Sequence, residues 1–221
     1  EATCHVHMRG MGHQEPMNSI EGLVELIAAS TVSGAPLHLV HIGSSGMRAV
    51  PRLLGMIEDA RANGVDVSTE VYPYPAAMTG IEAAIFAEGW QEKLGIGYGD
   101  LEWCETGERL TSESFGRYRE TGGWVIMHMI PQDAVDTAVA HELTMIASDG
   151  LLIDGKGHPR TSGTYSRVLG RFVRESGTVT LMDALRKMAL MPAQRLEHRV
   201  PAMAGKGRIK TGADADIVVF D

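Results

Sequence analysis

The chain has 221 residues, of which 44% are hydrophobic and 22% charged, a composition typical of a globular domain. Its formal net charge of -8 disfavours nucleic acid as a partner, because nucleic-acid-binding domains carry a basic surface. No segment approaches the roughly 18 consecutive apolar residues of a membrane span, and two cysteines are too few for a disulfide framework, so we expect a cytoplasmic protein without membrane contact.

Short apolar runs alternate with helical patterns along most of the chain. The runs predict β-strands over residues 2–8, 37–41, 65–72, 124–129 and 143–149. Three helical stripes, with apolar residues at positions i, i+3, i+4 and i+7, begin at Ile20, Val50 and Leu181. Gly64 is placed to end the second helix and Thr180 to cap the third. This alternation predicts parallel βαβ units, because a parallel crossover needs a covering helix.

Two segments break the alternation. Residues 90–107 fit neither pattern, and we expect a long loop there. Residues 205–221 contain two short strand-like runs separated by glycine and aspartate. This tail predicts a second, β-rich unit that follows the βαβ region.

Polar residues gather at or near the carboxyl ends of the predicted strands. These residues are His7, His41, Tyr72, His128 and Asp149. In a β/α barrel, that end of the strands carries the active site. Neutral imidazoles bind zinc and a nearby carboxylate can move protons, so the pattern predicts a zinc-type hydrolytic site.

Each of these residues also has a purely structural interpretation. A histidine that ends an apolar run, such as His41, can be a hydrogen-bonded core residue. The H-x-H pattern of His5 and His7 places both imidazoles on one face of a strand, but such short patterns also arise by chance. Asp149 precedes a glycine and fits a turn, and Tyr74 fits a rigid packed turn. The ordered recurrence of polar residues at strand ends favours the chemical interpretation.

A series of motifs adds a family resemblance. The motifs are HMR at 7–9, LVH at 39–41, TEVYPY at 69–74, IASDG at 146–150, HPR at 158–160, GTYSRVL at 163–169 and GADADIVVFD at 212–221. In this order they resemble the D-aminoacylase and N-acyl-D-glutamate deacylase branch of the amidohydrolase superfamily. The resemblance covers nearly the whole chain, although the last motif alone marks only the superfamily.

The resemblance implies an α/β fold, a (β/α)8 TIM-barrel-type metal-dependent hydrolase, of which this chain holds strands five to eight. Residues 1–200 would form the carboxyl-terminal half of the barrel, and residues 201–221 part of a composite β-sandwich. A complete barrel takes about 250 residues. The family's first-strand H-x-H motif and bridging ligand have no match here, and the chain starts at Glu1 rather than at Met. We therefore expect that an N-terminal half-barrel of the same protein is missing from this chain.

The resemblance also assigns the candidate site residues. In that family, the histidine of the HMR motif and the next strand-end histidine both bind zinc. Here they are His7 and His41, so we expect one or two Zn²⁺ ions, with the two reactive nitrogens within about 5 Å of each other. Asp149 would be the general base, and Tyr72 and Arg160 would hold the α-carboxylate of a small-molecule substrate.

Three further positions lie beside these motifs or depart from them. We expect His128 to contact the substrate and His5 to be a bystander. Many D-aminoacylases carry a lysine two residues after the sixth-strand histidine, where this sequence has Gly43, so one carboxylate contact is lost or moved. Without the resemblance, Arg160 would be interpreted as a surface arginine on a glycine-rich loop.

The predicted function is metal-dependent hydrolysis of the amide of N-acyl-D-amino acids, with N-acyl-D-glutamate among the candidates. Two alternatives stay open. One is a cyclic-amide hydrolase similar to dihydroorotase or hydantoinase, which would share the metal and the base but not the HPR carboxylate clamp. The other is a catalytically incomplete half-barrel without enzyme activity.

Overall fold

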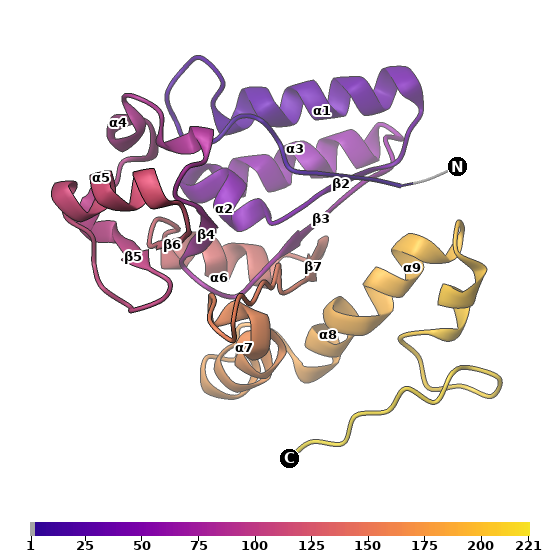
Figure 1. Cartoon of the computed structure of the whole chain (residues 1–221). Coiled ribbons are helices and arrows are strands. Elements are labelled where there is room, and N and C mark those ends of the chain that lie inside the picture. Colours follow the sequence, from indigo (N-terminus) through magenta and orange to yellow (C-terminus); the bar gives the residue numbers. More distant parts are fainter. Residues whose placement is uncertain (1–2) are drawn as a thin grey trace.

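Four short strands form a parallel sheet in a computed structural model that describes residues 3–221 (Figure 1). In sheet order they are β1 (Cys4–Val6), β2 (Leu37–Leu39), β3 (Val67–Val71) and β7 (Thr144–Ile146). The register aligns Val6, Leu39, Thr69 and Thr144 across the sheet. The parallel pairing confirms four of the predicted strands, although the expected start of the first, at Ala2, lies outside the described residues.

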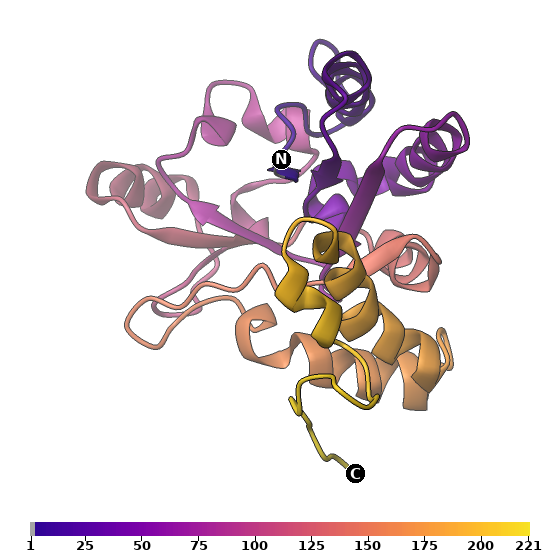
Figure 2. The same cartoon turned by 90° about the vertical axis from the view of Figure 1, so that its right-hand side faces the viewer.

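Helices cover the outer side of this sheet. They are α1 (Ser19–Ser33), α3 (Val50–Ala62) and α6 (Gln132–Ala140), which follow one another in an arc around the strands (Figure 2). Helix α1 begins after Asn18 because the Asn18 side chain accepts hydrogen bonds from two backbone N–H groups of the first turn. Four parallel strands with helices outside them make a partial β/α barrel, in which β1 and β7 each pair on one side only within the described residues.

Two longer helical segments follow β7. Helix α7 (Arg160–Arg167) continues as a π-helical segment, Val168–Glu175. Helix α8 (Leu181–Leu185) runs through a π-helical turn, Arg186–Leu190, into α9 (Met191–Glu197). The Thr180 side chain accepts from the Asp183 backbone N–H at 3.1 Å, which confirms the expected cap of this helix.

A second, antiparallel sheet lies at the carboxyl edge of the first (Figure 1). Its strands are β4 (Ala77–Gly80), β6 (Trp124–Met127) and β5 (Leu101–Trp103), in that order, with α4 (Trp90–Leu94) and α5 (Ser112–Thr121) beside them. Two expectations were wrong here. The run at 124–129 is a strand but does not belong to the parallel sheet, because its neighbours pair with it antiparallel. The segment 90–107 is not a loop, because it holds α4 and β5.

The tail forms none of the predicted strands. A 3₁₀ turn spans Pro201–Gly205, and residues 206–221 run on without a strand. Ile217, Val218 and Val219 are 65%, 82% and 92% exposed. A β-strand needs a partner for its backbone groups, and in Figure 1 the tail extends away from both sheets. Residues 206–221 therefore join neither sheet, and the assignment of residues 201–221 to a β-sandwich stays a prediction.

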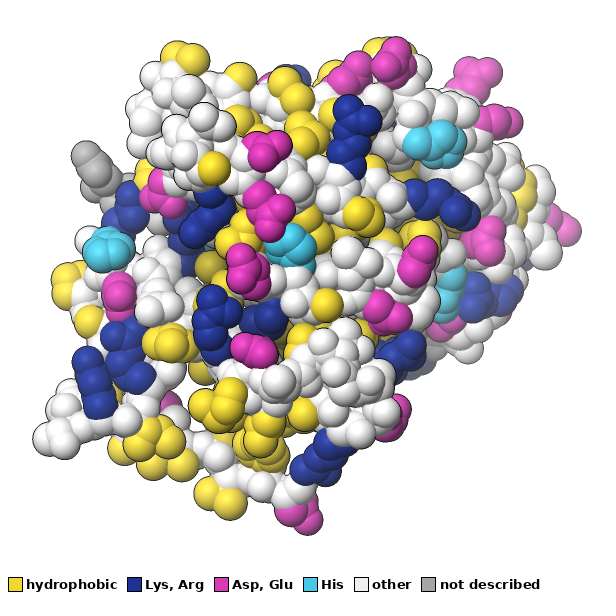
Figure 3. Space-filling view, turned by 180° about the vertical axis from the view of Figure 1, so that it is seen from behind, with side chains coloured by type: hydrophobic (Ala, Val, Ile, Leu, Met, Phe, Trp, Pro, Cys, Tyr) yellow, Lys and Arg dark blue, Asp and Glu magenta, His cyan; other side chains and the backbone are white. Residues whose placement is uncertain are grey.

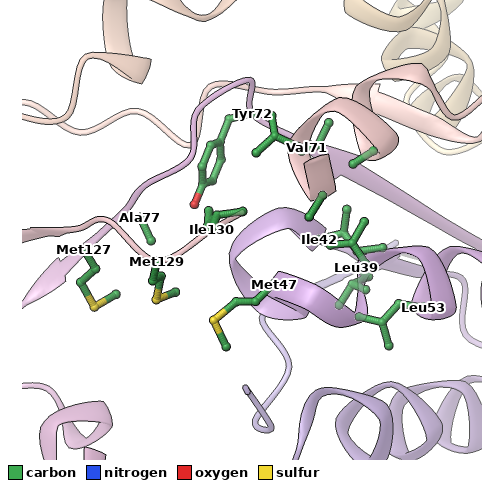
Figure 4. Close-up of a cluster of buried hydrophobic side chains, with 14 of the residues drawn as sticks. Leu39, Ile42, Met47, Leu53, Val71, Tyr72, Ala77, Met127, Met129 and Ile130 are labelled. Carbon is green, nitrogen blue, oxygen red and sulfur yellow. The ribbon is translucent and has the colours of Figure 1, made fainter. Parts of the chain in front are cut away.

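The interior and the surface agree with the composition. Buried apolar side chains that include Leu39, Ile42 and Leu53 pack between β2, α2 (Ile42–Gly46) and α3 (Figure 4). Acidic and basic side chains are interspersed over the face seen in Figure 3. Across residues 3–221 no helix combines the length and the apolar character that a membrane crossing requires. Cys4 and Cys104 are both free thiols.

Candidate active site

The structure brings His7 and His41 together at the carboxyl edge of the parallel sheet. His7 follows β1 by one residue and His41 follows β2 by two, so both leave the sheet at the same edge. The His7 Nδ1 atom lies 2.9 Å from His41 Nε2, and the rings meet edge to face with centroids 4.7 Å apart. The expected proximity of the two reactive nitrogens is confirmed.

His41 has a left-handed backbone conformation, with φ 39° and ψ 57°. Non-glycine residues in this region are strained, and such strain gathers at functional sites. Here the conformation turns the chain from β2 directly into α2. Burial lowers the pKa of His41, an effect that Asp149 opposes and His7 reinforces. Burial thus favours the neutral imidazole, which is the form that binds a metal.

The facing nitrogens fit a shared metal ion. Two ligands of one tetrahedral zinc are about 3.3 Å apart, because each bond to histidine is about 2.0–2.1 Å long. The observed 2.9 Å is slightly shorter, a difference that a small rotation of either ring removes. Among residues 3–221, no cluster of three or more His, Cys, Asp or Glu side chains could hold a metal. This part of the chain therefore offers two ligands of a zinc site rather than a complete set.

Asp149 and Arg160 form an ion pair in the same cavity as the two histidines. The Arg160 Nη2 atom lies 2.9 Å from Asp149 Oδ2. Arg160 is the first residue of α7 and is only 4% exposed, so it is not a surface arginine on a loop. Asp149 has a positive φ of 47°, as His41 does, and follows the end of β7 by three residues. Its carboxylate is 38% exposed and can meet a ligand.

Two rings hold the Arg160 residue in place. The guanidinium carbon lies 4.4 Å from the centroid of the Tyr72 ring, and His158 Nδ1 accepts from the Arg160 backbone N–H at 3.0 Å. Burial and, to a smaller extent, the Arg160 charge lower the pKa of His158 to about 3. Burial raises the pKa of Tyr72 to about 12. Tyr72 packs among apolar residues such as Ala77 (Figure 4) and does not line the cavity, so it contacts Arg160 rather than the open space.

His128 lies outside this cavity. It follows β6, and its Nε2 atom pairs with Glu102 Oε2 of β5 at 2.9 Å. The expectation that His128 ends a strand of the parallel sheet was wrong, because β6 belongs to the antiparallel sheet, whereas its contact with a substrate stays a prediction. An apolar run predicts a buried strand, but it does not indicate which sheet the strand joins.

One wall of the cavity comes from residues that the sequence analysis did not assign. The cavity has a volume of about 670 Å³, within the usual range of small-molecule sites. Apolar side chains of the second sheet and its connections line this wall: Met78, Ile85, Trp90, Leu94, Trp124 and Met127. Strand β4 escaped notice because it is only four residues long and lacks alternation. The apolar run at 124–127 was the one available signal, and it was placed in the wrong sheet.

Comparisons with known proteins agree with the fold. No protein-family model matches the chain. An N-acyl-D-glutamate deacylase of Alcaligenes xylosoxydans xylosoxydans is 35% identical over 181 residues, which cover 76% of this chain and 35% of the relative. A crystal structure of a D-aminoacylase, described as defining a novel subset of amidohydrolases, matches 96% of the chain with a TM-score of 0.77 and 28% identity.

A third relative was solved with ligands. The N-acyl-D-glutamate deacylase from Bordetella bronchiseptica, complexed with zinc and a phosphonate mimic of the tetrahedral intermediate, matches with a TM-score of 0.76 and 26% identity. A dihydroorotase of Syntrophus aciditrophicus is also similar, at 26% identity over 189 residues. This chain covers 44% of the D-aminoacylase and 45% of the Bordetella enzyme, so it spans less than half the length of these structures.

The fold of this chain is thus similar to part of the amidohydrolase structures of the D-aminoacylase type. More narrowly, its resemblance to the D-aminoacylase and N-acyl-D-glutamate deacylase branch is confirmed by these relatives.

Proposed function

We propose that this chain supplies part of the active site of a zinc-dependent N-acyl-D-amino-acid deacylase. Such an enzyme hydrolyses the amide to a carboxylate and a free D-amino acid. The observation that carries the proposal is the 2.9 Å approach of His7 Nδ1 to His41 Nε2, in a cavity that Asp149 and Arg160 also line. The similar deacylase solved with zinc supports the choice of metal.

In this proposal each residue of the cavity has a chemical role. His7 and His41 would hold one of one or two zinc ions, and zinc held there would supply Lewis acidity toward the scissile carbonyl and the attacking water. Asp149 takes a proton from that water and delivers it to the leaving nitrogen, which can then depart as a neutral amine. Arg160 binds the substrate carboxylate through two parallel hydrogen bonds. A substrate carboxylate competes with Asp149 for this guanidinium.

We further propose that residues 1–200 correspond to strands five to eight of a larger barrel and that a segment outside this chain supplies the other strands and ligands. Two observations support this. Strands β1 and β7 each have one neighbour among the described residues, and the two histidines do not complete a metal site there. The exposed apolar residues of 217–219 support a separate β-rich unit for the tail, outside the barrel.

The alternative of a cyclic-amide hydrolase has one observation in its favour, the similarity to a dihydroorotase. The higher identity to the N-acyl-D-glutamate deacylase, 35% against 26% for the dihydroorotase, favours the deacylase, and the buried Arg160 is placed to bind a substrate carboxylate. A catalytically incomplete half-barrel is the remaining alternative, and only a measurement on the full gene product tests it.

The test combines metal content with a substrate panel. The full gene product is purified, its zinc is quantified, and its hydrolysis of N-acetyl-D-glutamate, N-acetyl-D-methionine, N-acetyl-L-methionine and dihydroorotate is measured. We expect bound zinc and turnover of at least one D-substrate but not of the L-substrate. Turnover of dihydroorotate alone would establish the cyclic-amide alternative, and a zinc-free, inactive protein would establish the incomplete half-barrel.

A further inference from the structure

A second, smaller cavity adjoins the candidate active site. Its volume is about 290 Å³, against about 670 Å³ for the cavity that His7 and His41 line. Met78 and Trp124 line both cavities, so their side chains form the partition between the two. Met78 lies opposite Ile126 in the register of β4 and β6, and Trp124 precedes Ile126 by two residues. Both partition side chains therefore project from the same face of the antiparallel sheet.

A tight hairpin, residues 151–157, forms the outer wall of the second cavity. Ile153 and Lys156 exchange two backbone hydrogen bonds, of 2.8 and 2.9 Å. The two residues between them, Asp154 and Gly155, have φ of 50° and 77°. These are the left-handed conformations of the two-residue hairpin turn that an Asp-Gly pair favours. The local sequence of the turn therefore determines the shape of the hairpin.

The hairpin is held at its base and at its tip. At the base, the Thr161 hydroxyl of α7 accepts from the Leu151 backbone N–H at 3.0 Å and lies 3.1 Å from the Leu151 carbonyl oxygen. Gly157 permits this close base, because a Cβ there would overlap the Leu151 carbonyl oxygen. At the tip, Lys156 Nζ donates to the carbonyl oxygen of Glu105, just after β5, at 2.6 Å. The hairpin therefore connects α7 to the antiparallel sheet as a fixed wall.

Successive side chains of the hairpin have different surroundings. Leu151 lines the larger cavity and Ile153 lines the second, whereas Leu152 lines neither. This alternation is expected for an extended backbone, in which side chains point to opposite sides in turn. The hairpin therefore contributes one apolar side chain to each of the two cavities.

The charges around the second cavity disfavour an anionic ligand. Its lining includes two carboxylates, Glu105 and Asp154, and one ammonium group, Lys156. The negative charges outnumber the positive one, so a carboxylate placed there would be repelled. The partition and the hairpin supply apolar side chains, so the second cavity suits an uncharged apolar group.

We propose that the second cavity is a subsite for an apolar extension of the substrate. Arg160 lines only the larger cavity, so a substrate whose α-carboxylate binds Arg160 reaches the second cavity with another part of the molecule. In an N-acyl-D-amino acid, that part is either the acyl chain or the amino-acid side chain. In both cases the extension passes Met78 and Trp124. This inference rests on the proposed function, and it specifies an unbranched apolar chain as the feature that the enzyme recognises.

The test uses two series of substrates with the full gene product, both of which start from N-acetyl-D-alanine. One series lengthens the acyl group to butyryl and hexanoyl, and the other lengthens the side chain to those of D-norvaline and D-norleucine. We expect kcat/KM to rise along one series, by up to about fourfold for each methylene group that leaves water. The series that rises identifies the part of the substrate that enters the second cavity.

Two neighbouring residues of the hairpin provide matched variants. Ile153→Trp fills the second cavity, whereas Leu152→Trp adds the same ring at a position that lines neither cavity. Leu152 and Ile153 are 52% and 39% exposed, so neither ring is forced into the core. Ile153→Trp should abolish the rise with chain length but leave kcat/KM for N-acetyl-D-alanine unchanged, and Leu152→Trp should retain the rise. Cys104→Phe, which fills the same cavity from the antiparallel sheet, should behave as Ile153→Trp does.

The outcomes separate this proposal from the proposed function. No rise along either series would overturn the subsite, and so would a rise that persists in both Ile153→Trp and Cys104→Phe or one that is lost equally in Leu152→Trp and Ile153→Trp. A parent protein that hydrolyses no member of either series would contradict the proposed function instead. In that case, calorimetric binding of N-hexanoyl-D-alanine and N-acetyl-D-norleucine to the parent protein and to Ile153→Trp still decides whether the second cavity takes an apolar chain.

Discussion

Strands β1 and β2 bring together two histidine pairs that look alike in the sequence. His5 and His38 lie within the strands, with ring centroids 4.6 Å apart. His7 and His41 lie beyond the strand ends, with centroids 4.7 Å apart. The spacing of the rings is nearly the same, but the surroundings of the two pairs are not.

Both ring nitrogens of His38 are already occupied within the sheet. Nδ1 lies 2.7 Å from Ser68 Oγ, and Nε2 lies 3.0 Å from Glu70 Oε2. These partners come from β3, because His38 stands opposite Ser68 in the parallel register. The Glu70 carboxylate accepts, so the proton of His38 lies on Nε2 and its Nδ1 lone pair accepts from the Ser68 hydroxyl, which leaves no lone pair for a metal.

His41 lies past the end of β2, where the neighbouring strand β3 no longer provides hydrogen-bond partners for both ring nitrogens. Its Nδ1 meets serines of its own helix, and its Nε2 faces another imidazole. The comparison teaches that the position along the strand, not the residue type, separates a structural histidine from a candidate ligand. This is the barrel rule that places chemistry at the carboxyl ends of strands.

The largest effect is expected at Asp149, which lines the same cavity as the His7–His41 pair. Asp149→Asn keeps the shape of the side chain but removes the proton acceptor, so turnover of an N-acyl-D-amino acid should fall about 10²–10⁴-fold. Steady-state kinetics of the full gene product measure this, and zinc content serves as the control for an intact site. Turnover within a few-fold of the parent would exclude Asp149 as the general base.

Substitution of one histidine in each pair tests the comparison directly. His41→Gln should weaken zinc binding by more than the roughly 10–100-fold typical of an outer hydrogen-bond partner, because a ligand itself is lost. His5→Gln should leave zinc affinity unchanged. Metal content after dialysis against a chelator checks both variants. Equal zinc loss in the two variants would contradict the division between the pairs.

Arg160→Lys should weaken kcat/KM for substrates with a free α-carboxylate by about 1.5–3 kcal/mol, because lysine cannot reproduce the two parallel hydrogen bonds. Arg167 provides a matched control. Its guanidinium carbon lies 4.7 Å from the Tyr74 ring centroid, but Arg167 does not line the cavity. Arg167→Lys should therefore have little effect on kcat/KM. If kcat/KM falls equally in Arg160→Lys and Arg167→Lys, Arg160 has no specific role in binding the substrate carboxylate.

A substitution beside the His5–His38 pair should change the stability of the protein rather than its zinc binding. Glu70→Ala leaves buried His38 Nε2 without its partner, which should lower the free energy of unfolding by about 1–3 kcal/mol. Zinc affinity should not change. Urea unfolding and a chelator titration measure the two quantities on the same sample. Weaker zinc binding without a loss of stability would place this pair in the site.

The smallest effect concerns acid stability. His158 has a pKa lowered to about 3 in the folded protein, mainly by burial, whereas an unfolded histidine titrates near its ordinary value of about 6.5. Between pH 6.5 and pH 3, the unfolded chain binds a proton on His158 that the folded protein does not bind. This contribution to stability is therefore fully present above about pH 6.5 and is lost as the pH falls toward 3.

His158→Asn keeps an acceptor near the Arg160 backbone but removes the titration. The free energy of unfolding of this variant should fall less between pH 7 and pH 5 than that of the parent protein. Parallel urea titrations at the two pH values measure the difference. An identical decrease in both proteins would show that His158 titrates normally in the folded state.

Local patterns were sufficient for the parts of the fold in which neighbours in the sequence are also neighbours in space. The stripe at Val50, Leu53, Leu54 and Ile57 became the buried face of α3. Four apolar runs became parallel strands, and the residues that follow two of them, His7 and His41, meet as expected. The parallel βαβ units therefore followed from periodicity, whereas the barrel and the pairing of His7 with His41 were implied by the family resemblance.

Other features depended on partners that are distant in the chain. The run at 124–127 carries a strand pattern that fits either sheet, and only its pairing with β4 and β5 assigned it to the antiparallel sheet. The tail at 217–219 has strand-like residues but no partner in this chain, so it forms no strand.

The sequence by itself determined the parallel strands, the helices that include Ile20, Val50 and Leu181, and which polar residues follow the strands, because these properties depend on periodicity along the chain. Only the tertiary structure decided which histidine nitrogens are already bound. That property depends on the register between β2 and β3, which occupies both nitrogens of His38, and on the turn into α2, which leaves Nε2 of His41 facing His7. Hydrogen bonds between residues about 30 positions apart leave no periodic trace in a sequence.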